Sequence, residues 1–196
     1  MTEICIQVEE TFEQAKAILA KSGFEFGEAF TNFDTYYSTL TSAEDEEYQT
    51  LLKNSIVVRH IVGDNCDVKN VVYKNKTLDA HGNVIDEVKT KVKVDDIEKA
   101  KQIFKNLGLN CWCDYAVNNF EMKKGELSVD LQYVENLGTF VEIEEYPSIK
   151  TLPDTKKFAI LKNIVKDLGF KMIGNDYSCK KPYMFLLKNH TNRTVI

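Results

Sequence analysis

The sequence lacks the features that identify zinc proteins, exported proteins and membrane-spanning proteins. Its five cysteines include no C-x-x-C pair and its three histidines are scattered, so the spacing of zinc ligands is absent. There is no apolar run of about 18 residues, the length that a membrane-spanning helix needs. The first twenty residues carry four glutamates and no apolar stretch typical of a signal peptide. We therefore expect a cytoplasmic protein with free thiols and no association with a membrane.

An excess of basic residues is also absent. The chain has 25 Lys and Arg against 30 Asp and Glu, which gives a net charge of −5 at pH 7. This balance argues against a broad basic surface for a nucleic-acid polymer or an anionic membrane, so any site for an anion must be local. The glycine-rich loops of P-loop and Rossmann proteins and the H-E-x-x-H motif are missing as well.

What remains is the composition of an ordinary globular domain. Apolar residues make up 43% of the chain and charged residues 28%, which is typical of folded, water-soluble domains. A length of 196 residues allows one full hydrophobic core. We predict a single domain over residues 1–196.

Three segments carry helix signals at both ends. The first runs from Thr11 to Gly23 and opens with the capping-box pattern Thr11-x-x-Gln14. The second follows Asp96 and ends at Gly108, and the third runs from about Asp154 to Gly169. The apolar residues of the second segment share one helical face and are Ile97, Ala100, Ile103, Phe104 and Leu107. A short acidic segment from Ser42 to Leu52 is a candidate fourth helix.

Between these helices, apolar and polar residues alternate with the period of a β-strand. The predicted strands are residues 3–8, 33–39, 55–62, 67–74, 87–94, 113–122, 129–133 and 141–144. The pattern predicts an antiparallel-rich α+β protein. Ala15, Ile18 and Gly23 recur as Ala100, Ile103 and Gly108 at an offset of 85 residues. This echo indicates two similar β-α-β halves, or a chance likeness between two amphipathic helices.

One face of the predicted strands is charged. Its acidic residues are Glu3, Glu87, Asp130, Glu142 and Glu144, and its basic residues are Arg59, Lys74, Lys89, Lys91 and Lys93. In an open sheet this face would be charged simply because it meets water. In a closed barrel the same residues would converge on a polar lumen, where carboxylates hold a divalent cation and Arg and Lys bind phosphate oxygens. The alternation by itself leaves both arrangements open.

The segment Leu137–Glu144 resembles the signature of a known family. It reads L-G-T-F-V-E-I-E and is similar to the L-G-x-F-x-E-I-E motif of the CYTH family, or triphosphate tunnel metalloenzymes. That family includes class IV adenylyl cyclases, thiamine triphosphatases and inorganic triphosphatases. Further pieces follow in the family's order, namely Glu3, the D-T-Y-Y run Asp34–Tyr37, Arg59, Lys74, Glu87 and Tyr183–Leu187. The resemblance thus covers nearly the whole chain.

The resemblance implies an eight-stranded antiparallel β-barrel, or tunnel, with helices packed outside it and two ferredoxin-like halves. It implies that Mg²⁺ or Mn²⁺ is held by Glu142, Glu144, Glu3 and Glu87. The residues that it assigns to the phosphates of a small anionic or phosphorylated ligand, a triphosphate or nucleotide, are Arg59, Lys74, Lys89 and Lys91. Further candidates for the lumen are Gln7, Asp130 and Gln132. The oligomeric state is left open, with a homodimer among the alternatives.

The sequence departs from the family's pattern at positions that matter for chemistry. Cys5 and Gln7 replace a glutamate and a lysine of the first motif. Val57 replaces the first arginine of R-x-R, and Gln132 stands where the family's usual catalytic aspartate falls. One hypothesis is an adenylyl cyclase or a triphosphatase-like phosphohydrolase, with no catalytic residue assigned. The alternatives are a catalytically inactive pseudoenzyme that keeps the tunnel as a scaffold, and a plain interaction module with an acidic surface.

Overall fold

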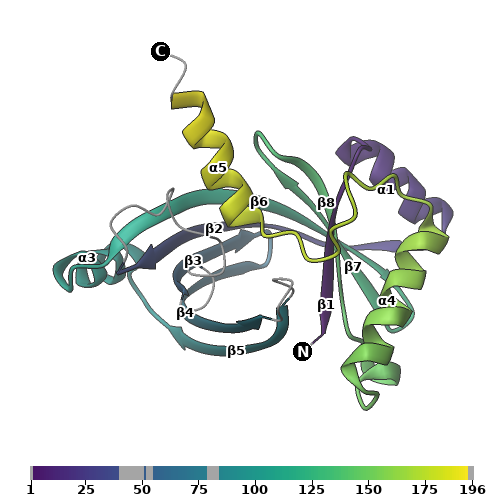
Figure 1. Cartoon of the computed structure of the whole chain (residues 1–196), viewed down its shortest axis with the longest axis horizontal. Coiled ribbons are helices and arrows are strands. Elements are labelled where there is room, and N and C mark those ends of the chain that lie inside the picture. The colour runs from purple at the N-terminus through teal and green to yellow at the C-terminus, as the bar shows by residue number, and fades with distance from the viewer. Residues whose placement is uncertain (1, 40–50, 52–54, 79–83, 194–196) are drawn as a thin grey trace. The chain divides into compact units, whose positions relative to one another are not determined.

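The computed structural model describes residues 2–39, 51, 55–78 and 84–193 (Figure 1). Within these residues the protein is α+β, with an eight-stranded antiparallel sheet and four α-helices. The strands are β1 (Glu3–Val8), β2 (Glu25–Ser38), β3 (Ser55–Gly63), β4 (Cys66–Leu78), β5 (Val84–Lys93), β6 (Asn110–Lys124), β7 (Leu127–Val134) and β8 (Gly138–Glu144). The helices are α1 (Phe12–Lys21), α3 (Ile97–Asn106), α4 (Asp154–Leu168) and α5 (Lys181–Arg193), and a 3-10 helix, η2, spans Pro147–Ile149. The predicted acidic helix over Ser42–Leu52 lies outside the described residues, apart from Leu51.

The three predicted long helices are confirmed, together with the signals that end them. Thr11 caps α1 through a capping box with Gln14, in which each residue's side chain accepts a hydrogen bond from the other's backbone N–H. Asp96 caps α3, and α4 ends at Gly169 with a φ of 75°, a conformation that favours glycine. Helix α5 was missed, because Pro182 and the weak helix formers near its end hide its periodicity. None of the described helices is long and apolar enough to span a bilayer.

The order of the strands is β1-β8-β7-β6-β2-β3-β4-β5. Within the described residues β1 and β5 are therefore the two ends of the hydrogen-bonded ladder, and the predicted closed barrel is not formed. One physical reason lies at the outer edge of β1, where the chain near Cys179 runs alongside the strand. The Cys5 N–H donates to the Tyr177 carbonyl and the Cys179 N–H donates to the Cys5 carbonyl, both at 2.9 Å. An edge that is already hydrogen-bonded does not accept another strand.

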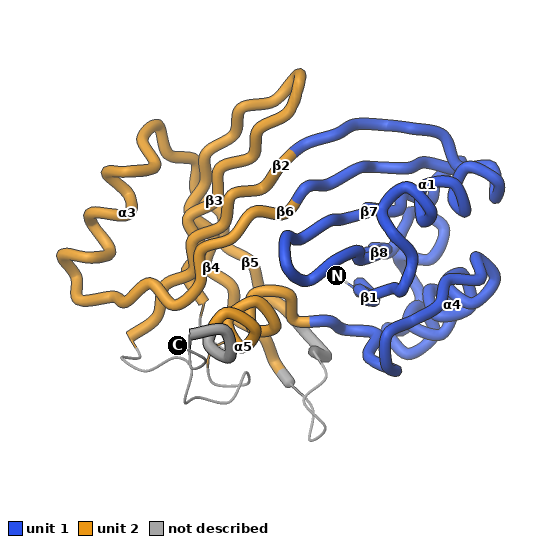
Figure 2. Tube along the Cα trace, turned by 90° about the horizontal axis from the view of Figure 1, so that it is seen from above, with its two compact units in different colours: residues 1–30, 118–179 blue, residues 31–117, 180–196 orange. Residues whose placement is uncertain are grey.

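Contacts divide the chain into two compact units (Figure 2). Unit 1 comprises residues 1–30 and 118–179, and unit 2 comprises residues 31–117 and 180–196, so that β2 and β6 contribute residues to both. In unit 1, α1 and α4 pack against one face of β1, β7 and β8. The buried side chains of that face include Ile4, Ile6, Val129, Leu131, Val141 and Ile143. The strand alternation predicted from the sequence is thus confirmed, and it leaves the intervening residues on the opposite face.

In unit 2, α3 packs against β3 and β4 around Tyr37, Val58 and Ala100. Ile103 and Leu107, which belong to the predicted apolar face of this helix, are nevertheless 57% and 71% exposed. Ile103 lies at the margin of the stripe that contacts the sheet, and Leu107 is the C-cap residue after the last helical turn. The apolar residues of β5 are not buried as in a simple amphipathic strand, since Val88 and Val92 are each 58% exposed.

Candidate functional site

Three carboxylates meet on the face of unit 1 that the helices leave uncovered. Glu3 lies directly opposite Glu144 in the β1–β8 ladder, and Glu142 follows at the next position on the same face. One ligand atom from each of the three residues lies within 4.8 Å of the others. Glu3 and Glu142 are half-buried, whereas Glu144 is exposed. Like charges on neighbouring strands repel, and a hard divalent cation with oxygen ligands would offset this repulsion. The three predicted residues therefore form a donor set that fits Mg²⁺ or Mn²⁺.

The acidic face continues across the next two strands. Asp130 on β7 lies opposite Glu142 on β8, and Glu121 on β6 lies opposite Asp130. The Glu121 carboxylate is held by the Lys123 ammonium at 2.8 Å and by the Ser128 hydroxyl at 3.0 Å. Asp130, a predicted candidate for the lumen, thus lies next to the metal-ligand candidates. Glu121 was missed, although the E-x-K pattern that ends β6 shows a charged face.

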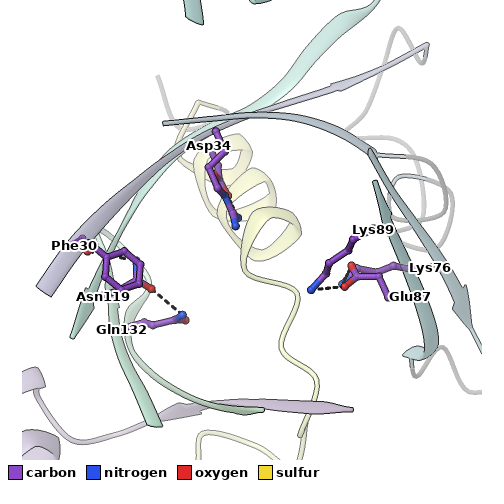
Figure 3. A network of polar contacts seen from close by, with 8 residues as sticks. Phe30, Asp34, Lys76, Glu87, Lys89, Asn119 and Gln132 are labelled. Atoms are coloured by element: carbon purple, nitrogen blue, oxygen red, sulfur yellow. Dashed lines mark hydrogen bonds and ion pairs between the residues drawn. The ribbon is translucent and has the colours of Figure 1, made fainter. Parts of the chain in front are cut away.

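Two amides stand where the CYTH pattern has charged residues, and both form hydrogen bonds within unit 1. The Gln7 Nε2 donates to the Leu137 carbonyl at 2.6 Å and so links β1 to the turn before β8. The Gln132 Nε2 donates to the Asn119 Oδ1 at 3.0 Å, and the Asn119 Nδ2 donates to the Phe30 carbonyl at 3.5 Å (Figure 3). Gln132 is only 4% exposed. These amides therefore bind the protein itself.

In unit 2, Arg59 is bound by the carboxylate of Asp34, which the sequence placed in a family motif but not among the site residues. The Arg59 Nε and Nη2 donate to the two carboxylate oxygens of Asp34 at 2.6 and 2.5 Å. Asp34 is 1% exposed and lies within the D-T-Y-Y run of β2. Burial opposes the charge of Arg59, but the contact with Asp34 outweighs it and raises the pKa of the guanidinium further. The pair fixes the guanidinium in one orientation, with the carboxylate buried behind it.

The lysines of β4 and β5 gather around Glu87. The Glu87 carboxylate lies 3.2 Å from the Lys76 Nζ and 2.7 Å from the Lys89 Nζ (Figure 3). Burial would raise the pKa of this carboxyl, but Lys76, Lys74 and Lys89 outweigh that effect and lower it. The contacts of Glu87 are thus with cations, and its part in a metal site stays a prediction. Lys76 was missed, although it follows Lys74 by two residues and so lies on the same strand face.

Lys74 lies beside this cluster, and its pKa is lowered. It is directly opposite Lys89 in the β4–β5 ladder, and its Nζ lies 5.9 Å from the centre of the Tyr36 ring. Burial, followed by the charges of Arg59 and Lys76, lowers the pKa of Lys74 to about 7. Lys91 shares this face of β5, opposite Val72, and is exposed. The four predicted phosphate-binding residues therefore all lie on one face of β3, β4 and β5.

Buried aromatic rings adjoin the basic residues of unit 2. Tyr36 contacts Trp112 and Tyr115 with ring centres 5.1 and 6.1 Å apart, and Tyr115 contacts Phe185 of α5 at 5.4 Å. Burial raises the pKa of both tyrosines well above the usual value, so they stay neutral. The rings provide a low-dielectric surround in which charges of the neighbouring residues act strongly.

Comparison with known proteins gives one relative in sequence and several in structure. No protein-family model matches the chain. The chain is 30% identical over 116 residues to "Putative adenylate cyclase MJ0240" of Methanocaldococcus jannaschii, a match that covers 59% of this chain and 63% of that protein. The chain thus spans less than two thirds of this relative.

Solved structures match over nearly the whole chain. The PH1819 protein of Pyrococcus horikoshii gives a TM-score of 0.72 at 17% identity, covering 96% of this chain and 98% of that one. The PH1012 protein of the same organism gives 0.67 at 21% identity, covering 90% and 97%. A "putative adenylate cyclase" of Vibrio parahaemolyticus gives 0.61 at 16% identity, covering 93% and 96%. At these identities the likeness concerns the fold.

The strand order, the acidic cluster and these matches define a protein of CYTH-like fold. In sequence the chain is distantly similar to one protein named a putative adenylate cyclase, and its fold is similar to those of two solved proteins that carry the same description. These matches agree with the family resemblance that the sequence predicted.

Proposed function

We propose that this chain binds a triphosphate or a nucleotide together with Mg²⁺ or Mn²⁺. The observation that supports the proposal most directly is the cluster of Glu3, Glu142 and Glu144, which offers three carboxylate ligand atoms within 4.8 Å. The name of the Methanocaldococcus relative, "Putative adenylate cyclase MJ0240", agrees with a nucleoside triphosphate as the class of ligand.

Each charged group then has a defined part. Glu3, Glu142 and Glu144 would hold the cation, which, when bound, would neutralise and polarise phosphate oxygens. Arg59, oriented by its two bonds to Asp34, keeps N–H groups for a phosphate oxygen. The lysines that would add positive charge without fixed geometry are Lys74, Lys89 and Lys91.

A catalytically inactive binding protein is the second candidate. Its support is the use of Gln7 and Gln132, where the CYTH pattern has a lysine and an aspartate, for hydrogen bonds within the protein. Phosphoryl and nucleotidyl transfer depend mainly on positioning and on the neutralisation of charge. An amide at these two positions removes one positive and one negative group from the ligand site, which would weaken turnover more than binding.

The test of binding is thermal unfolding with tripolyphosphate, ATP or thiamine triphosphate, each with and without Mg²⁺ or Mn²⁺. A ligand at one hundred times its dissociation constant stabilises the fold by about 2.7 kcal/mol. We expect stabilisation that needs both metal and polyphosphate, that is lost in Glu142→Gln, and that persists in Glu135→Gln, which makes the same charge change at an exposed position. The absence of a metal-dependent effect with every ligand would overturn the proposal.

Turnover separates the two candidates. Release of phosphate or pyrophosphate from one of these triphosphates, abolished by Glu142→Gln and kept by Glu135→Gln, would establish a phosphohydrolase or a cyclase. Metal-dependent binding without release of either product would establish the inactive binding protein.

A further inference from the structure

The amine of Lys74 lies among cations whose carboxylate partners are already taken. In the basic cluster of unit 2, the Asp34 carboxylate is bound by Arg59, and the Glu87 carboxylate is bound by Lys76 and Lys89. Within the part of the chain that the structure describes, no carboxylate lies within 4.0 Å of the Lys74 Nζ. The Lys74 Nζ instead lies over the Tyr36 ring, 5.9 Å from the ring centre, where a weak cation–π interaction is possible. Lys74 thus differs from Arg59, Lys76 and Lys89, because it forms no ion pair with any residue that the structure describes.

The surroundings of this amine disfavour its protonated form. Lys89 lies directly opposite it in the ladder, and Lys76 lies two residues along the same strand face. Burial has the largest effect on the pKa of Lys74, the charges of Arg59 and Lys76 act in the same direction, and Asp34 and Glu87 oppose them weakly. With a pKa of about 7, close to half of the amine is unprotonated near neutral pH. Lysines that are desolvated or placed next to other cations are the ones that react as nucleophiles.

The same cations would attract an anionic substituent to the amine. Arg59 has further N–H groups beyond the two that bind Asp34. Lys89 lies directly opposite Lys74 on the neighbouring strand. A ligand with a phosphate at one end and an electrophilic carbon near it would meet both the cations and the free amine. Aldehydes are the simplest electrophiles with which an amine reacts reversibly in water.

We propose that Lys74 is a reactive amine that forms an imine with aldehydes bearing a phosphate group. The Nζ lone pair adds to the carbonyl carbon and one amine proton passes to the carbonyl oxygen, which gives a carbinolamine; the second amine proton leaves with the hydroxyl group in the next step. That intermediate loses its hydroxyl group as water, and the carbon–nitrogen double bond forms in its place. The exchange of one aldehyde and one amine for one imine and one water needs no oxidant, reductant or other reactant. The preference for a phosphate rests on the proposed function, whereas the reactivity of the amine does not.

The experiment uses pyridoxal 5'-phosphate and unphosphorylated pyridoxal as probes on the full chain, each followed by borohydride reduction and peptide mass spectrometry. The comparison lysines are Lys99 and Lys105, which are exposed on α3 of the same unit. We expect Lys74 to be modified at least about tenfold faster than either, because its amine is far less protonated at neutral pH. The phosphorylated probe should react faster than pyridoxal, and tripolyphosphate should protect Lys74 from it.

The variants Lys74→Arg and Lys74→Met should lose the imine absorbance, while Lys105→Met should keep it. The arginine variant retains the positive charge, so the test stands even if the methionine variant folds poorly. Modification of Lys74 no faster than that of Lys99 and Lys105 would overturn the inference, and it would leave the proposed function intact if polyphosphate still stabilises the fold with metal. Rapid modification of Lys74 by both probes, without protection, would support the reactive amine and contradict the phosphate site.

Discussion

Asp34 on β2 and Arg59 on β3 are joined by two hydrogen bonds between one guanidinium and one carboxylate, at 2.6 and 2.5 Å. The carboxylate is buried almost completely, whereas the arginine side chain is 23% exposed. The pair therefore connects two strands and leaves part of the arginine side chain exposed. Such an arrangement holds a phosphate-binding group in place before any ligand arrives.

Removing Arg59 would leave the Asp34 carboxylate buried without its partner. We expect Arg59→Met to lower the free energy of unfolding by about 3–5 kcal/mol, measured by urea denaturation, because an unpaired buried charge is costly. The control is Lys99→Met, which breaks an exposed pair with Asp96 and should cost less than about 1 kcal/mol. An Arg59 variant no less stable than this control would show that the pair does not stabilise the fold.

In the acidic cluster, unlike at Arg59, removing one charge should not destabilise the protein when no metal is bound. In the presence of a chelator, Glu142→Gln removes a like charge beside Glu3 and Glu144. The melting temperature should therefore stay constant or rise, and the free energy of unfolding should increase by up to about 1 kcal/mol. With Mg²⁺ and tripolyphosphate the variant should instead be the less stable protein. A destabilised variant under both conditions would mean that Glu142 supports the fold and not a cation. Glu135→Gln should be neutral throughout.

The hydrogen bond between Gln132 and Asn119 is predicted to be structural. We expect Gln132→Leu and Asn119→Leu each to cost about 1–3 kcal/mol, because each leaves its buried partner without this bond. The double variant should cost less than the sum of the two single variants, as a double-mutant cycle by chemical denaturation would show. Strict additivity would mean that the two amides act independently.

Lys74 should make stability depend on pH. Because its pKa falls from the usual value near 10.5 to about 7 on folding, the unfolded chain binds more protons between these values, and stability should rise with pH across that window. The charged or titratable groups that face it are Lys76 on its own strand, Arg59, Asp34, Tyr36, Glu87 and Lys89. Denaturation curves from pH 7 to about 10 should show a weaker rise in Lys74→Met than in wild type or in Lys105→Met. Equal slopes in all three proteins would contradict the lowered pKa.

Local signals in the sequence predicted most of the elements. The helices that begin after Thr11 and Asp96 and the one that ends at Gly169 follow from capping chemistry, which involves residues within one turn of each other. The carboxylates of Glu142 and Glu144 were predictable as neighbours because side chains two apart on a strand share a face. Helix α5 and the exposure of Ile103 were not, since both depend on which surface a helix finds to pack against.

The sequence by itself determined the two faces of the strands, because apolar and charged side chains alternate with the strand's own period of two. Only the tertiary structure decided which charges meet: Glu3 with Glu142 and Glu144, Arg59 with Asp34, and Glu87 with two lysines. It also decided that the ladder ends at β1 and β5, and that Lys74 has no carboxylate partner among the described residues. The physical reason is one of range, since alternation is a property of a single strand, whereas register, burial and desolvation are set by residues far apart in the chain.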